Sequence, residues 1–127
     1  MIGYVTIGTN DFEKAKTFYD AVLGELGGKR AWNSDRMQGY SAGAGPMVAV
    51  CKPFDGKSAS SGNGTMFSLA APDQAAVKRV YDKAIAMGAT DEGAPGFRGA
   101  ESMGFYGAYF RDPDGNKLCA FCMVKPQ

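Results

Sequence analysis

The feature that most constrains the fold is an order of predicted elements that occurs twice along the chain. Moving the sequence by 62 positions places Ile7 on Leu69, Asp11 on Asp73 and Tyr19 on Tyr81. Identity between the halves is weak, so the repeated order of elements carries more weight than the matching letters. Such self-similarity indicates one supersecondary unit used twice within 127 residues.

The first half predicts a strand, a helix and three further strands. Residues 2–8 alternate and are rich in β-branched side chains, which is typical of a strand. A helix follows, and we expect Asn10 to cap it while Glu13, three residues later, completes a capping box. The remaining strands are expected at residues 29–33, 37–42 and 47–51.

The second half repeats this order after a segment rich in Pro, Ser and Gly at residues 52–64. A strand at 65–70 precedes a helix that begins at Pro72 and Asp73 and closes at Gly88. Further strands are expected at residues 97–102, 104–110 and 117–124. The pattern predicts an α+β fold with two β-α-β-β-β modules, at about 1–52 and 64–127, joined by a linker at about 53–63.

Composition excludes several classes of partner. Charged residues make up 21% of the chain and the net charge is +1, so no field of one sign attracts nucleic acid or an anionic membrane. No apolar run approaches the ~20 residues of a membrane span, and no leader segment is evident. We expect a single cytoplasmic domain without nucleic-acid or membrane partners.

The three cysteines favour reduced thiols over a disulfide framework. Cys119 and Cys122 have CxxC spacing, but they lie in a predicted strand, where residues three apart point to opposite faces. We therefore expect two half-buried apolar side chains rather than a redox pair or a metal chelate.

Three segments, taken with the duplicated unit, identify a family. Residues 111–116 read Arg-Asp-Pro-Asp-Gly-Asn, a tight turn before a closing strand. Residues 5–11 and 15–24 supply the first strand end and the helix of the unit. Together they resemble the vicinal oxygen chelate superfamily of glyoxalases, bleomycin resistance proteins and extradiol dioxygenases.

That resemblance implies paired modules whose mixed sheet curves around a cup-shaped cavity, commonly completed by two chains, so a homodimer is expected. In enzymes of the superfamily, first and last strands of the modules supply His, Gln and Glu ligands to a divalent metal that polarises a substrate oxygen. The resemblance places those positions at Tyr4, Met66 and Cys119, and at or near Ala49. A histidine of close relatives corresponds to Ser102.

None of these positions keeps a metal-binding side chain of that kind, and the chain contains no histidine. Hard divalent ions prefer imidazole and carboxylate donors, whereas a soft copper(I) site at Met66 and Cys119 is the remaining metal alternative. We expect no metal and no cofactor, and a cavity wall suited to an organic ligand.

Aromatic side chains supply further candidates for this cavity. We expect the wall to include Tyr4, Met66, Cys119, Ser102, Trp32 and Tyr106. Residues 92–104 are rich in glycine, carry Arg98 and Glu101, and are expected to form a mobile rim. Glu101, with Tyr4, is the candidate for acid-base chemistry.

Three functions follow from these features. A metal-independent small-molecule-binding protein is the first hypothesis, because the metal-ligand positions hold uncharged side chains. A glyoxalase-like lyase or isomerase with noncanonical metal ligands, or with Glu101 and Tyr4, is the second. A structural or regulatory dimerisation module without a ligand is the third.

Overall fold

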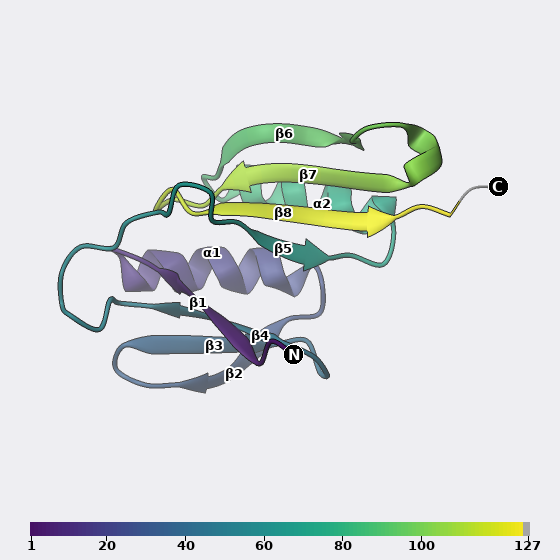
Figure 1. Ribbon diagram of the computed structural model, residues 1–127. Helices are drawn as coiled ribbons and strands as arrows, with labels where there is room; N and C mark the ends of the chain where they lie inside the picture. Colours follow the sequence, from purple (N-terminus) through teal and green to yellow (C-terminus); the bar gives the residue numbers. More distant parts are fainter. Residues whose placement is uncertain (126–127) are drawn as a thin grey trace.

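A computed structural model describes residues 1–125 of the chain and confirms the duplicated unit (Figure 1). The first module contains β1 (Tyr4–Gly8), α1 (Phe12–Gly24), β2 (Lys29–Asn33), β3 (Met37–Ser41) and β4 (Met47–Cys51). The second contains β5 (Phe67–Ala70), α2 (Gln74–Ala86), β6 (Thr90–Phe97), the 3-10 turn η1 (Glu101–Met103), β7 (Phe105–Arg111) and β8 (Lys117–Met123). The α+β class and the β-α-β-β-β order are as predicted.

Each module forms its own four-stranded mixed sheet. The strand orders are β1-β4-β3-β2 and β5-β8-β7-β6. In both, the first strand pairs in parallel with the last, and the other neighbours are antiparallel. β1 and β5 lie near the centre of the molecule, where each is the edge strand of its own sheet (Figure 1). The two modules therefore do not form one continuous sheet.

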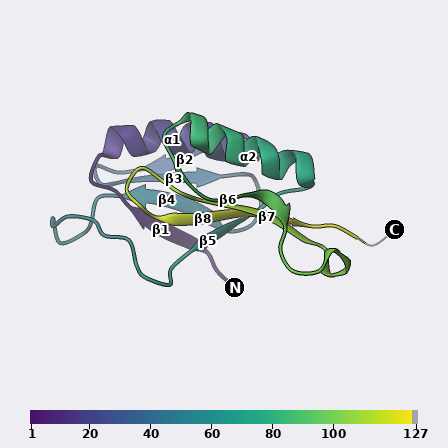
Figure 2. The ribbon, with the colours of Figure 1, turned by 90° about the horizontal axis from the view of Figure 1, so that it is seen from above.

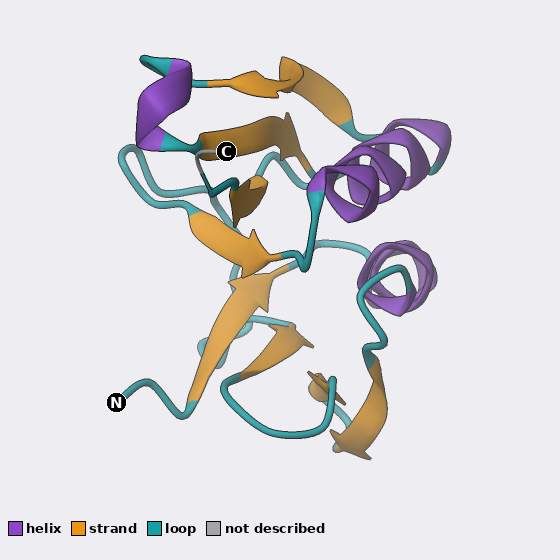
Figure 3. Cartoon of the chain, turned by 90° about the vertical axis from the view of Figure 1, so that its right-hand side faces the viewer, coloured by secondary structure: helices purple, strands orange, loops and turns teal. Residues whose placement is uncertain are grey.

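Both helices cover the same side of the molecule, where they lie next to each other (Figures 2 and 3). Their apolar faces supply Phe18 and Val22 from α1 and Val77 and Val80 from α2, all at most 1% exposed. Burial of each such side chain contributes roughly 1.5–3 kcal/mol. Because one face of each sheet packs against this core, only the opposite face can carry a binding site.

The prediction of a strand at residues 97–102 is wrong. β6 ends at Phe97, and residues 101–103 form the turn η1 instead. The glycines and proline of β6 hid its alternation, because the strand is irregular: its register against β7 shifts on both sides of Gly93. Residues 92–97 of the predicted mobile rim therefore lie in a paired strand.

The predicted capping box at α1 is also wrong. Asp11, not Asn10, is the N-cap, and its carboxylate accepts a hydrogen bond from the Lys14 amide at 3.1 Å. Asn10 instead holds the linker, because its side chain accepts from the Ala59 amide at 2.7 Å and donates to the Ala59 carbonyl at 3.1 Å. Glu13 pairs with a lysine one turn further along the helix.

A buried carboxylate in the turn between β7 and β8 ties the two modules together. Asp112 is 4% exposed and accepts hydrogen bonds from the Tyr19 hydroxyl of α1 at 2.6 Å and from the Asn116 side chain at 2.9 Å. The backbone amides of Asp114 and Asn116 also donate to it. Asn116 in turn donates to the carbonyl of Gly8 in β1 at 2.9 Å. We call this group the Asp112 clasp.

No helix among residues 1–125 is long and apolar enough to cross a membrane. The three cysteines are free and buried. Cys122 packs into the helix-side core, whereas Cys119 lies on the other face of β8, as the alternation predicted.

Candidate functional site

The faces of the two sheets that lie opposite the helices are the candidate site, and we call them the open faces (Figure 3). On the first module, the register places Tyr4 of β1 beside Met47 of β4 and Thr6 beside Ala49, and alternation puts Cys51 on the same face. A cavity of about 530 Å³ lies over this open face, beneath the linker. Its lining includes Tyr4, Thr6, Met37, Cys51 and Phe54, together with the charged residues Arg36 and Asp55.

Two aromatic rings meet on this first open face. The Tyr4 and Trp32 ring centroids are 5.9 Å apart, with the planes at 80°, an edge-to-face arrangement. Trp32 lies over Gly39 of the neighbouring strand, where a Cβ atom would come within 2.3 Å of the indole. The absence of a side chain at residue 39 therefore allows the indole to lie against the sheet.

The open face of the second module is centred on a buried thiol. Cys119 is 0% exposed and lies between Ser68 of β5 and Tyr109 of β7 in the strand register. Burial raises the pKa of Cys119, while hydrogen bonding to Ser68 and Tyr109 and the charges of Arg98 and Lys117 act in the opposite direction. The net shift is upward, so this side chain is a neutral thiol at neutral pH.

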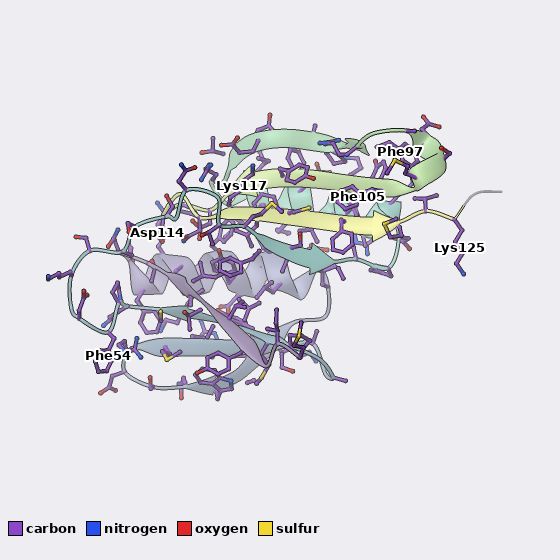
Figure 4. The ribbon with its side chains drawn as sticks, viewed as in Figure 1. Phe54, Phe97, Phe105, Asp114, Lys117 and Lys125 are labelled. Atoms are coloured by element: carbon purple, nitrogen blue, oxygen red, sulfur yellow. The ribbon has the colours of Figure 1, made fainter. Side chains whose placement is uncertain are left out.

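An aromatic stack continues this second open face toward the other end of β8. Phe105 and Phe121 stack with centroids 5.4 Å apart and planes at 5°. In Figure 4, Phe105 lies at the start of β7 and Lys117 at the opposite end of the sheet, at the start of β8. The second open face therefore has an apolar end and a charged end.

Met66 lies next to the gap between the modules. It immediately precedes β5, is 40% exposed and lines an apolar cleft of about 570 Å³. Leu23 and Leu26 of the first module and Leu69 of the second line the same cleft. Met66 therefore lies at the boundary between the second open face and this cleft.

Comparison with known proteins agrees with this architecture. The family model for the glyoxalase/bleomycin resistance protein/dioxygenase superfamily matches residues 1–120. The chain belongs to this superfamily. None of the curated proteins matches the sequence.

Solved structures of the superfamily cover nearly the whole chain. A glyoxalase/bleomycin resistance protein from Albidiferax ferrireducens T118 is 36% identical, with a TM-score of 0.88 over 98% of this chain and 99% of that chain. A glyoxalase/bleomycin resistance protein/dioxygenase family enzyme from Burkholderia phytofirmans PsJN is 23% identical, with a TM-score of 0.77 over 96% and 98%. A lactoylglutathione lyase from Agrobacterium tumefaciens shares the fold at 20% identity, with a TM-score of 0.70 over 96% and 92%.

The positions at which the resemblance places the superfamily's metal ligands, Tyr4, Met66, Cys119 and one at or near Ala49, do not suit a hard divalent ion. Tyr4 and Ala49 lie on the first open face, Cys119 lies on the second, and Met66 lies at the boundary described above. They offer a phenol, a methyl group, a neutral thiol and a thioether, whereas such ions prefer imidazole and carboxylate. Within residues 1–125, no three His, Cys, Asp or Glu side chains gather as a metal-binding group.

The structure separates the other predicted site residues. Trp32 joins Tyr4, but Tyr106 points to the helix side, where its ring meets Phe97 at 5.3 Å and packs against the core. Glu101 and Ser102 lie on η1, and both are exposed. Neither of these two makes a side-chain hydrogen bond or ion pair within the described part of the chain.

The sequence-based choice of Tyr106 for the cavity wall is wrong, because Tyr109 occupies the open face instead. Alternation alone splits residues 105–110 into two sets without saying which faces the helix. The burial of Phe110 in the core decides it, because Phe110 and Tyr109 must point to opposite faces.

Proposed function

We propose that this chain is a metal-independent small-molecule-binding protein whose ligand lies against the open faces. One inference carries the proposal: where the resemblance places the superfamily's metal ligands, this chain carries Tyr4, Met66 and Cys119, and a small residue at or near Ala49. They offer a phenol, a methyl group, a thioether and a thiol, which present apolar surface with a few hydrogen-bonding atoms, the usual lining of an organic-ligand pocket.

The dimensions of the first open face support this reading. Its cavity of about 530 Å³ falls within the roughly 300–1,000 Å³ that is common for small-molecule pockets. Tyr4 is 54% exposed, so its phenol and ring edge are available to a ligand. An aromatic pair with two polar atoms, the Tyr4 hydroxyl oxygen and the Trp32 indole nitrogen, orients a planar ligand at little cost in side-chain entropy.

A glyoxalase-like lyase or isomerase is the alternative, and the geometry favours it less. Its candidate acid-base groups belong to different modules, with Tyr4 on β1 and Glu101 exposed on η1. Efficient proton transfer requires both groups within hydrogen-bond reach of one reacting centre.

We also propose that the protein works as a homodimer in the cytoplasm. The exposed side chains of Tyr4, Met66 and Met123 add apolar surface on or beside the open faces, which a second copy of the chain would cover. Three free thiols fit a reducing compartment. Sedimentation velocity at micromolar concentration tests the dimer: a species of twice the chain mass is expected, and a monomer throughout contradicts it.

The binding proposal is tested with the intrinsic fluorescence of Trp32, the only tryptophan of the chain. A panel of small aromatic acids, amides and amines is titrated into untagged protein, with and without EDTA. We expect a saturable change for at least one compound, with the same dissociation constant in both conditions. Calorimetry of the same panel detects ligands that do not reach Trp32.

The matched control is Trp32→Phe, which removes the signal but retains a ring over Gly39. Calorimetric affinity that survives in this variant separates loss of the reporter from loss of the site. Absence of binding across the panel contradicts the proposal, and binding that EDTA abolishes favours a metal-dependent function.

A further inference from the structure

Two cations on the second open face flank a single aromatic ring. Arg98 follows β6 and turns back over the sheet, so that its guanidinium carbon lies 5.2 Å from the centroid of the Tyr109 ring. Lys117 comes from β8, on the other side of β7, and its Nζ lies 5.6 Å from the same centroid. Both distances are within the range of a cation-π contact.

Backbone groups of β6 hold the Arg98 side chain in position. Its guanidinium donates to the carbonyls of Ala94 at 2.7 Å and Gly96 at 3.1 Å. A Cβ atom at Gly93 would lie 2.9 Å from one terminal guanidinium nitrogen, and one at Gly96 would lie 3.2 Å from the other. The guanidinium therefore rests on two positions that lack side chains, and the carbonyls hold it in place.

Neither cation is neutralised by a carboxylate within residues 1–125. Arg111 provides the contrast, because it lies on the same face of β7 and pairs with Glu92 at 2.8 Å. The charges of Arg98 and Lys117 both act to lower the pKa of Cys119 against the larger effect of burial.

We propose that Arg98 and Lys117 bind the carboxylate of a small organic acid, with Ser68 and Tyr109 beneath it. This inference rests on the proposed ligand-binding function and names the chemical class of the ligand. It also predicts that compounds with a cationic group are rejected, because two uncompensated positive charges repel them.

The chemistry of the cluster suits a carboxylate. A guanidinium has five N–H donors, and those not directed at backbone carbonyls remain available for an anionic oxygen. The exposed Ser68 lies next to Cys119 in the register and adds a hydroxyl donor. The stacked Phe105 and Phe121 rings lie on the same face and offer an apolar surface for the body of the acid.

The experiment compares matched acids and amides, which differ in charge but little in shape. 2-Naphthoate and 2-naphthamide, and benzoate and benzamide, are titrated into 15N-labelled protein, following the amide signals of Ser68 and Cys119. We expect each acid to bind at least about tenfold more tightly than its amide, and the acid affinity to fall as NaCl rises from 50 to 300 mM.

Two variants test the assignment of the cations. Lys117→Gln and Arg98→Gln are each expected to weaken binding of 2-naphthoate about tenfold while leaving 2-naphthamide unchanged. Lys78→Gln removes the same charge from α2, on the helix side, and should leave both affinities unchanged. The Lys117 side chain makes no hydrogen bond within residues 1–125, so its variant remains informative if Arg98→Gln folds poorly.

The outcomes distinguish this inference from the function on which it rests. If amides or amines bind as tightly as acids, or if both variants keep full acid affinity, the carboxylate assignment is overturned while ligand binding stands. If no compound in either panel binds, both the assignment and the proposed function fail.

Discussion

The two open faces have the same strand topology and different chemistry. The first presents the Tyr4 and Trp32 rings over a cavity beneath the linker, whereas the second presents Arg98 and Lys117 around Tyr109. The strand topology determines the positions of these side chains, and it is the same in both modules. The residue types at those positions determine which ligands each face can bind. The duplicated unit is therefore a shared frame that carries two unlike surfaces.

Glycine has a similar role on both faces. Gly39 gives Trp32 room to lie on the first sheet, and Gly93 and Gly96 give Arg98 room on the second. In each module, a missing side chain lets a large neighbour lie against the strands. The contrast between the faces thus depends on small residues as much as on the aromatic and charged ones.

The largest predicted effect concerns the Asp112 clasp, in which a carboxylate of the second module accepts a hydrogen bond from Tyr19 of the first. Asp112→Ala leaves several buried donors unpaired, so we expect the free energy of unfolding to fall by about 3 kcal/mol or more. Urea unfolding at pH 7 measures it. The companion Tyr19→Phe removes one donor and should cost about 1–2 kcal/mol. A loss under 1 kcal/mol for Asp112→Ala would show that the modules do not depend on the clasp.

A smaller effect is expected at Gly39. Gly39→Ala places a methyl group against the indole of Trp32, so we expect a loss of about 1–3 kcal/mol in unfolding free energy. The fluorescence maximum of Trp32 should shift as the ring leaves the sheet. Gly3→Ala, with no atom within 4 Å of the added methyl, is the control. An unchanged spectrum and stability in Gly39→Ala would contradict the packing described here.

The pH dependence of stability probes the second face. Because burial raises the pKa of Cys119, the folded protein retains this proton after the unfolded chain loses it near pH 8.5. The contribution of Cys119 to the free energy of unfolding is therefore fully present below that pH, and it declines as the pH rises above it. We expect Cys119→Ala to reduce the decline between pH 8.5 and 10, as measured by urea unfolding. An identical pH profile would argue against a buried neutral thiol.

The smallest effect is expected at Glu101, which is exposed on η1. Glu101→Gln should change the free energy of unfolding by less than about 0.5 kcal/mol and leave ligand affinity unchanged. Calorimetric titration with any ligand found in the panel provides the check. A tenfold loss of affinity would show that Glu101 belongs to the binding site, and it would favour the alternative in which Glu101 acts in acid-base catalysis.

Much of the fold could be predicted from the sequence, because the apolar periodicity of residues 12–24 indicates a helix and that of residues 117–123 a strand. β6 was misplaced, since its glycines and bulges erase the alternation on which a strand prediction depends. Tyr4 and Trp32 were correctly expected on one module, but their contact depends on Gly39 in a neighbouring strand. Such a contact is set by register between strands, which no local pattern encodes.

The Arg98 and Lys117 cluster was outside the reach of sequence reasoning for the same reason. Arg98 was expected on a mobile rim, whereas the structure folds it back onto β6 through backbone carbonyls. Its proximity to Lys117 arises only when β6 and β8 flank β7 in the sheet. The two residues that give the second face its charge are therefore 19 positions apart in the chain. The strand order of the sheet places them on either side of β7.

The most direct test is the metal content of untagged protein purified without chelator and measured by inductively coupled plasma mass spectrometry. The donor set of Tyr4, Ala49, Met66 and Cys119 predicts well under one zinc, nickel, iron or manganese ion per chain. One equivalent of such an ion, lost in Cys119→Ala or Tyr4→Phe, would contradict the account.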